Sequence, residues 1–317
     1  MAARQLMRMM RHGGLQLKRY RFGVCAAAAF ALCSLFCGCR TAPPPPEQAV
    51  VDAVDLLDGK SAFYLKIPAS LDPTLLRRML SGSFKSLSDE DARMIVSRVD
   101  TLYAGLTRKA SSSEFQLAAS CAVPKAAVPY VFSAKNGWKT RRTTPITADQ
   151  PVWNIYNNGS LDVALPSERI VCAGRAAPEM LRAYHALSRA EPPYAAAYGA
   201  SDALSIPVRE WLTDGGDEIR FFAVSPQSFL ASLTGTNLNY KLAYARGKMA
   251  AIPNDSVQYV MEFEFEFRDK SIVLAAKAAL SLAFGLTDSE AILETPTHLK
   301  LRGIKIDREY VYKVLVL

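Results

Sequence analysis

The chain has 317 residues, of which 50% are hydrophobic and 21% are charged, so it can bury the core of one large domain or two ordinary ones. This composition excludes a disordered or fibrous protein. The net charge of +8 comes mostly from six basic residues among the first 38, and the remaining 32 basic against 30 acidic residues give little support to nucleic-acid binding.

The first 48 residues differ in composition from everything after them. Basic residues from Arg4 to Arg21 precede an apolar run from Phe22 to Gly38, and four prolines, Pro43 to Pro46, follow shortly afterwards. A basic segment, an apolar segment and a small residue at the cut are the parts of a secretory signal. We therefore predict a signal peptide over residues 1–38. A proline-rich tether over 39–48 would hold the rest of the chain away from a membrane.

The end of the apolar run, Leu35-Phe36-Cys37-Gly38-Cys39, resembles the lipobox of bacterial lipoproteins. It has the loosened form found in spirochaetal, and in particular treponemal, envelope lipoproteins, with Phe36 where a smaller residue is usual. The resemblance implies that the Cys39 sulfur receives a diacylglycerol and that the new amine is acylated, for example with palmitate. It also implies a lipid-anchored protein of the cell envelope, and Arg40 after the cysteine favours the outer membrane, facing the periplasm. An uncleaved transmembrane anchor and an ordinary signal are the alternatives.

The chain after the tether is typical of an α+β protein with antiparallel sheets and helices packed on one face. The clearest strand is 261–267, where three glutamates alternate with apolar residues, as in a sheet with one face in water. Asn158-Gly159 between two alternating runs predicts a hairpin with a type I′ turn. The predicted strands are 61–67, 115–119, 153–156, 161–165, 169–172, 218–224, 261–267, 299–306 and 310–316, and the predicted helices are 50–57, 75–80, 88–99, 178–187 and 271–284.

Internal similarity indicates two duplicated halves. Residues 54–59 followed by SAFYLKIP resemble residues 209–215 followed by DEIRFFAVSP. A second match aligns Thr144-Pro145 with Thr295-Pro296 and makes 161–165 equivalent to 312–316. We therefore divide the chain into a first α+β half at 49–175, a helix and linker at 176–207, and a second half at 208–317. A groove between the halves would be the natural ligand site.

No catalytic or metal-binding pattern emerges. His12 leaves with the signal, and neither His185 nor His298 has a second histidine or a carboxylate at ligand spacing. Glu262, Glu264 and Glu266 share one strand face, for which a solvated outer face is the simpler interpretation. We predict no enzyme, no metal ion and no cofactor.

Two further features bear on function. Cys121 and Cys172 would reach an oxidising compartment, where either a disulfide between them or two buried free thiols is compatible with the sequence.

The helix 272–284 is apolar almost all round. Burial in the core is one interpretation, and contact with a membrane or an apolar ligand is the other. The side chains that would make such a contact are Ile272, Leu274, Leu280 and Phe284.

Three functional hypotheses remain. The first is a non-catalytic, lipid-anchored envelope lipoprotein that binds another envelope protein or an apolar ligand between its halves. The second is an envelope hydrolase whose site is assembled only in three dimensions. The third is a lipoprotein that inserts into the membrane through the helix 272–284. A solvated loop is the simplest interpretation of the densest basic patch after the signal, which consists of Lys135, Lys139, Arg141 and Arg142.

Overall fold

The structure is a computed structural model that describes residues 50–83, 88–108, 113–145, 150–159, 161–189, 203–224, 226–227, 241–283 and 289–315. Contacts divide the chain into Met1–Gln48 and Ala49–Leu317, and all described elements belong to the second unit. This unit therefore contains the hydrophobic core that independent folding requires. The signal peptide, Cys39, the proline-rich tether and Phe284 lie outside the described residues. Within the described residues, none of the helices has the length and apolar character needed to span a bilayer.

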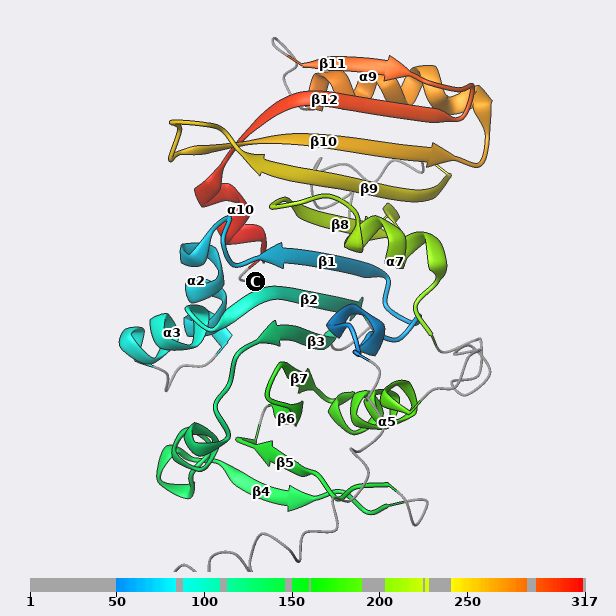
Figure 1. Ribbon diagram of the computed structural model, residues 1–317. Helices are drawn as coiled ribbons and strands as arrows, with labels where there is room; N and C mark the ends of the chain where they lie inside the picture. Colours follow the sequence, from blue (N-terminus) through cyan, green and yellow to red (C-terminus); the bar gives the residue numbers. More distant parts are fainter. Residues whose placement is uncertain are drawn as a thin grey trace, which may run out of the picture. The chain divides into compact units, whose positions relative to one another are not determined.

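The described elements alternate between strands and short helices along the chain (Figure 1). Up to residue 188 they are η1 (Ala53–Leu56), β1 (Phe63–Pro68), α2 (Pro73–Ser83), α3 (Asp89–Val96), β2 (Val99–Arg108), β3 (Ser113–Cys121), η2 (Lys125–Ala127), α4 (Val128–Val131), η3 (Ala134–Asn136), β4 (Lys139–Arg142), β5 (Asn154–Asn157), β6 (Asp162–Ser167), β7 (Ile170–Gly174) and α5 (Ala177–Ser188). They continue with α7 (Ile206–Thr213), β8 (Ile219–Ala223), β9 (Leu242–Ala251), β10 (Gln258–Phe267), η5 (Lys270–Ile272), α9 (Val273–Ala283), β11 (Glu290–Leu293), β12 (His298–Asp307) and α10 (Arg308–Leu315).

The strands of the described residues form one 12-stranded sheet in the order β11-β12-β10-β9-β8-β1-β2-β3-β7-β6-β5-β4. The pairs between neighbouring strands are antiparallel, so the predicted α+β class with antiparallel pairing is confirmed. The two predicted halves meet where β1 pairs with β8, with Leu65 opposite Phe221. The sheet is continuous at this point, and the groove between the halves stays a prediction.

Helices cover both faces of the sheet, and the expectation that they pack on one face is wrong. One core joins Leu65 of β1 and Phe221 of β8 to α2, α3, α9 and α10. A second core, on the other face, joins Tyr64 and Phe222 of the same strands to η1, α5 and α7. All five residues of β8 are buried, as a strand covered on both faces requires. A third, smaller core lies under Phe132 and Trp138, and it shares Leu117 with the first core.

Two predicted elements differ from the structure. Residues 310–316 were expected as a strand because Tyr and Val favour strands, but 308–315 form helix α10, so the proposed equivalence of 161–165 with 312–316 is also wrong. The Asp307 side chain accepts a hydrogen bond from the Glu309 N–H at 2.7 Å and caps this helix. The predicted helix 88–99 is shorter in the structure, because α3 ends at Val96 and Val99 begins β2.

The hairpin at Asn158-Gly159 is present, but its turn is not type I′. Asn157 pairs with Asp162, which leaves a four-residue connection, and the Asn158 side chain accepts a hydrogen bond from the Leu161 N–H at 2.9 Å. Gly159 has φ of +95°, whereas Asn158 has no positive φ, and a type I′ turn needs both.

Candidate functional site

Helix α9 contacts the sheet through one narrow row of side chains. Asp269 caps the preceding turn by accepting a hydrogen bond from the Ser271 N–H at 2.9 Å. Val273, Ala276 and Leu280 are then each 1% exposed, at the spacing of three and four residues that places them on one side of a helix. Of the predicted contact residues, Leu280 therefore faces the core, and Ile272 packs partly against it.

The opposite side of α9 is apolar and exposed. Leu274 is 70% exposed and Leu282 is 84% exposed, with Ala278 exposed between them. A helix on a protein surface normally shows polar residues on this side, and exposed apolar patches mark sites of interaction. We call Leu274, Ala278 and Leu282 the α9 outer row. Figure 1 draws α9 at the end of the sheet formed by β11 and β12.

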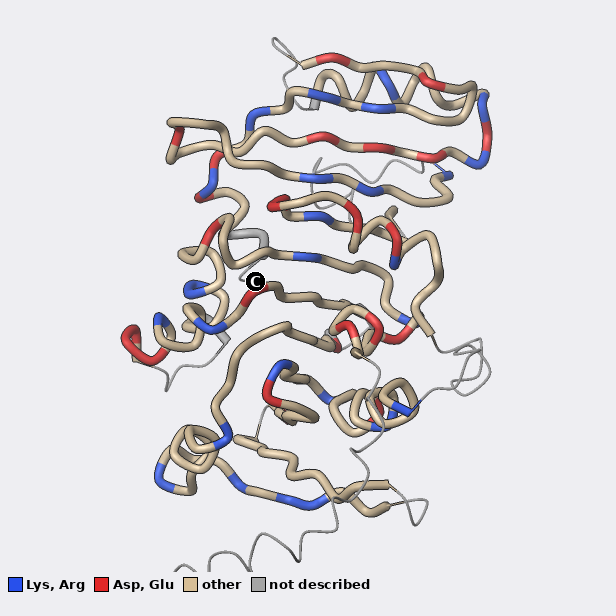
Figure 2. The backbone as a smooth tube through the Cα atoms, viewed as in Figure 1, with Lys and Arg blue, Asp and Glu red and all other residues tan. Residues whose placement is uncertain are grey.

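On the other face of the same strands lies a network of charges. Figure 2 shows the acidic stripe of β10 running between basic segments of β9 and β12. Glu264 is 7% exposed and accepts hydrogen bonds from Arg246 Nε at 2.6 Å and Lys300 Nζ at 2.8 Å. Burial by itself would raise the pKa of Glu264, but the hydrogen bonds from Lys300 and Arg246 outweigh it, so the pKa is lowered. The predicted solvated face is therefore wrong for Glu264, which is a buried, paired anion.

His298 belongs to this network, although no carboxylate was expected at ligand spacing from it. Its Nδ1 lies 3.0 Å from Glu266 and its Nε2 lies 3.6 Å from Glu294. The sheet brings them together because β10 pairs with β12, with Glu266 opposite His298. No group of acidic, histidine or cysteine side chains within the described ranges is arranged to hold a metal ion. His185 lies elsewhere, on α5, with its ring edge-on to Trp153.

The two cysteines of the sheet are free and buried, which is the second of the two sequence interpretations. Cys121 ends β3 and Cys172 lies in the neighbouring β7. Burial raises the pKa of the Cys121 thiol to about 11 and that of Cys172 to about 12. Both groups are therefore protonated and poorly reactive at neutral pH.

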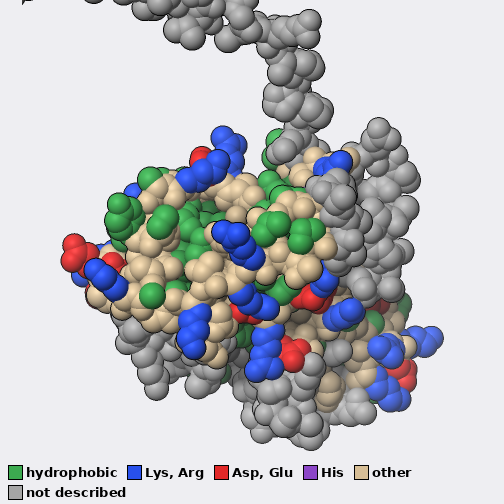
Figure 3. Space-filling model, turned by 90° about the horizontal axis from the view of Figure 1, so that it is seen from below, with side chains coloured by type: hydrophobic (Ala, Val, Ile, Leu, Met, Phe, Trp, Pro, Cys, Tyr) green, Lys and Arg blue, Asp and Glu red, His purple; other side chains and the backbone are tan. Residues whose placement is uncertain are grey.

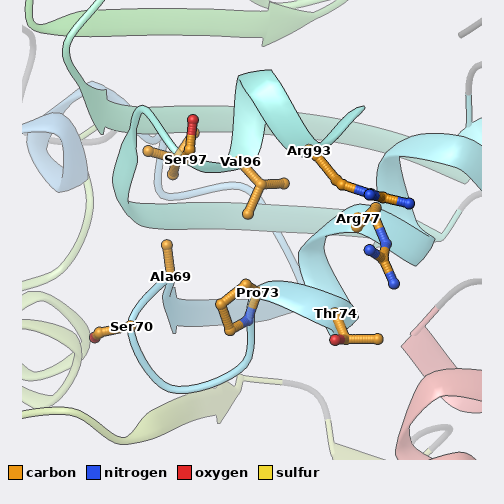
Figure 4. A pocket seen from close by; sticks show the side chains of 9 residues that line it. Ala69, Ser70, Pro73, Thr74, Arg77, Arg93, Val96 and Ser97 are labelled. Carbon is orange, nitrogen blue, oxygen red and sulfur yellow. The ribbon is translucent and has the colours of Figure 1, made fainter. Parts of the chain in front are cut away.

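A cavity of about 360 Å³ lies between α2, α3 and the adjoining ends of β1 and β2 (Figure 4). Its lining contains both apolar and polar residues, and Figure 4 shows the guanidinium groups of Arg77 and Arg93 close to each other on one side. Both arginines also lie near Asp89, at 3.9 Å and 3.2 Å. The lining residues are Ala69, Ser70, Pro73, Thr74, Arg77, Arg93, Val96, Ser97 and Val99.

These features define an α+β protein in which one antiparallel sheet supports the α9 outer row, the charge network and the cavity. A family model described as "Outer membrane-associated lipoprotein TP0453" matches residues 48–312, and the chain therefore belongs to this family of treponemal lipoproteins. The predicted resemblance to treponemal envelope lipoproteins is confirmed. The predicted placement, as a lipid-anchored protein of the cell envelope associated with the outer membrane, is confirmed as well.

Solved structures agree in fold. Crystal form I of TP0453 has a TM-score of 0.62 over 84% of this chain and 98% of that chain, at 18% sequence identity. Crystal forms III and IV of the same protein give TM-scores of 0.63 and 0.61 with the same identity and coverage. At this identity the likeness is one of fold alone. Among curated proteins, no sequence matches the chain.

Proposed function

We propose that this lipoprotein is non-catalytic and works at the bilayer surface, where the α9 outer row contacts the membrane in addition to the lipid on Cys39. The observation that carries the proposal is the exposure of Leu274 and Leu282 on the side of α9 that faces away from the core. Full burial of one leucine contributes about 1.5–3 kcal/mol. Two leucines therefore add about 3–6 kcal/mol to membrane attachment, which is comparable to a single weak lipid anchor.

The charge network supports the non-catalytic part of the proposal. A general acid or base works best with a pKa near the working pH. Glu264 has a lowered pKa and two cationic partners, so it stays ionised at neutral pH. Neither Glu264 nor His298 lines the cavity between α2 and α3. The alternative of a hydrolase needs a buried acid or base inside a cleft, and these two residues do not meet that need.

Binding of vesicles tests the membrane contact. Residues 49–317, which carry no lipid, are mixed with phosphatidylcholine vesicles and separated by flotation. We expect the unmodified fragment to float with the vesicles and the variant Leu274→Asn/Leu282→Asn to remain behind. Val257→Asn, which changes a valine 57% exposed outside α9, is the control and should float normally. Failure of the unmodified fragment to bind, or equal binding by all three, would reject the membrane contact.

A second candidate function is binding of a partner or an apolar ligand, and the cavity between α2 and α3 favours it. Its apolar lining residues and two arginines fit a molecule with an apolar part and an anionic group. Native mass spectrometry of protein extracted from its source membrane tests this. Absence of any co-purified lipid or protein would count against it.

We infer that the two halves arose by duplication, and the strand order supports this. Outward from the central pair, β1-β2-β3-β7-β6 on one side corresponds to β8-β9-β10-β12-β11 on the other. The segment before β1 (η1) and the segment before β8 (α7) pack in the same core. An experimental structure in which these two sets superpose in this strand order supports duplication. Superposition only in another order would contradict it.

A further inference from the structure

The end of the sheet that carries β4 is basic and has an unusual lack of acidic residues. Between Glu114 and Asp149 the sequence contains no acidic residue, but it contains Lys125, Lys135 and three basic residues of β4. Figure 3, which views the structure from this end, shows blue side chains around exposed hydrophobic ones. We call Lys125, Lys135, Lys139, Arg141 and Arg142, together with Tyr130, the β4 end surface.

Most of these cations are not neutralised by the residues that the structure describes. Lys125 lies 3.4 Å from Glu168, and Arg141 lies 2.7 Å from Asp162. For Lys135, Lys139 and Arg142, no acidic group lies within ion-pair distance in the part of the chain that the structure describes. All four residues of β4 are exposed. Like charges that are close together without partners repel one another. Binding of an external anion would relieve this repulsion and so lower the free energy.

The surface also displays an aromatic side chain on a rigid base. Tyr130 is 78% exposed at the tip of α4. The side-chain amide of Asn136 donates hydrogen bonds to the Tyr130 and Val131 carbonyls at 2.9 Å and 3.1 Å. Beneath this turn, the Phe132 ring meets Trp138 edge-on at 4.9 Å between ring centres. Tyrosine beside lysine and arginine is the composition that suits the headgroup region of a bilayer.

Protection of the sheet edge is the simpler explanation for a charged terminal strand, because lysines on an edge strand discourage pairing with another sheet. It accounts for Lys139 and Arg142, which lie on β4. It does not account for Lys135 or for the outward-facing Tyr130, since neither belongs to an edge strand.

We propose that the β4 end surface binds the headgroups of anionic lipids. The chain belongs to a family of membrane-associated lipoproteins, so a bilayer is within reach of its surfaces. The site is separate from the α9 outer row, because β4 and β11 are the opposite ends of the strand order and the row is apolar. The proposal therefore does not depend on the membrane contact of α9.

Vesicle composition separates the two contacts. Residues 49–317 are titrated with phosphatidylcholine vesicles and with vesicles that also contain phosphatidylglycerol, at low and at high salt. We expect tighter binding to the anionic vesicles and loss of this difference at high salt. Each cation near an anionic surface strengthens binding about fivefold. The triple variant Lys135→Gln/Lys139→Gln/Arg142→Gln should therefore bind anionic vesicles about 100-fold more weakly, with unchanged binding to phosphatidylcholine.

A matched variant controls for net charge. Arg268→Gln/Lys270→Gln/Arg302→Gln removes three exposed cations from the other end of the sheet and should retain anionic-vesicle binding. Circular dichroism and thermal unfolding check that both variants fold. If the Lys135/Lys139/Arg142 variant is unfolded, single substitutions at these three positions should each weaken anionic-vesicle binding about fivefold, whereas single substitutions at the control positions should leave it unchanged.

Three results would overturn the proposal. The first is an unmodified fragment that does not prefer anionic vesicles. The second is an equal loss of binding in both triple variants, which would indicate net charge alone. The third is association of the Lys135/Lys139/Arg142 variant with itself, with unchanged lipid binding, which would indicate edge protection alone. If the Leu274/Leu282 variant loses binding to phosphatidylcholine but keeps the anionic preference, the two contacts are independent, as proposed.

Discussion

The substitution Asp72→Ala should strongly destabilise the fold, because this buried carboxylate holds the carboxyl-terminal helix to the first helix. Asp72 is 3% exposed and precedes α2, where it accepts a hydrogen bond from the Leu75 N–H at 2.9 Å. It also accepts hydrogen bonds from the hydroxyl groups of Tyr259 on β10 and, at 2.6 Å, Tyr312 on α10. Arg308 lies 4.0 Å from the carboxylate. Burial comes first among the causes that raise the Tyr312 pKa to about 12, so this hydroxyl remains a donor.

The magnitude follows from the number of partners. A hydrogen bond to a charged group contributes about 1.5–3 kcal/mol, and loss of a helix cap costs about 1 kcal/mol. Removing one member of a buried charged cluster costs about 3–5 kcal/mol in all, because the contributions are not additive. We therefore expect Asp72→Ala to lower the free energy of unfolding by about 3–5 kcal/mol, a large share of the total of about 5–15 kcal/mol.

Urea unfolding of residues 49–317, followed by tryptophan fluorescence, measures this difference. Asp89→Ala is the matched control. Asp89 begins α3 and has an ion pair with Arg93, but its side chain is 64% exposed, so its loss should cost no more than about 1 kcal/mol. The reasoning is refuted if the two substitutions have similar effects, or if Asp72→Ala changes the urea midpoint by no more than the control.

Three further predictions follow from the buried groups and the anchor. Because the pKa of Glu264 is lowered below its ordinary 4.5, its contribution to stability is present above that pH and is lost as the pH falls through the folded-state value. Urea unfolding at falling pH should show that the free energy of unfolding decreases less for Glu264→Gln than for the unmodified protein. An equal decrease in both proteins would contradict this. The raised thiol pKa values predict that Cys121 and Cys172 react with a thiol reagent at neutral pH only after unfolding, and absence of two thiols in the unfolded protein would show a disulfide instead. Cys39→Ser should abolish lipid attachment, as measured by mass analysis and detergent partitioning of protein from its native cells, and a mass that falls by no more than the exchange of Cys for Ser itself would show that residue 39 is not acylated.

Local patterns predicted those elements whose formation depends on neighbouring residues. The alternation in β10 and the hairpin between β5 and β6 are visible in the sequence because side-chain direction in a strand repeats every two residues. The non-alternating run of β1 was also a usable signal, since a strand with apolar residues on both sides is covered on both faces.

The remaining features depend on contacts between distant residues. His298 and Glu266 meet only through the pairing of β12 with β10, and no sequence spacing marks them as neighbours. Helix α10 contains residues that favour strands, and its Tyr312 donates a hydrogen bond to Asp72, which is far away in the sequence. The basic residues near β4 were visible, but their position at an open sheet edge was not.

The pairing of β1 with β8 also has a consequence for how the chain folds after export. β1 lies near the start of the folded part, and its partner β8 is made only after well over half of the remaining chain has been synthesised. Until then β1 presents an open edge, which is prone to associate with other chains. Variants that delay the arrival of β8 should therefore aggregate during biogenesis even when their final stability is normal.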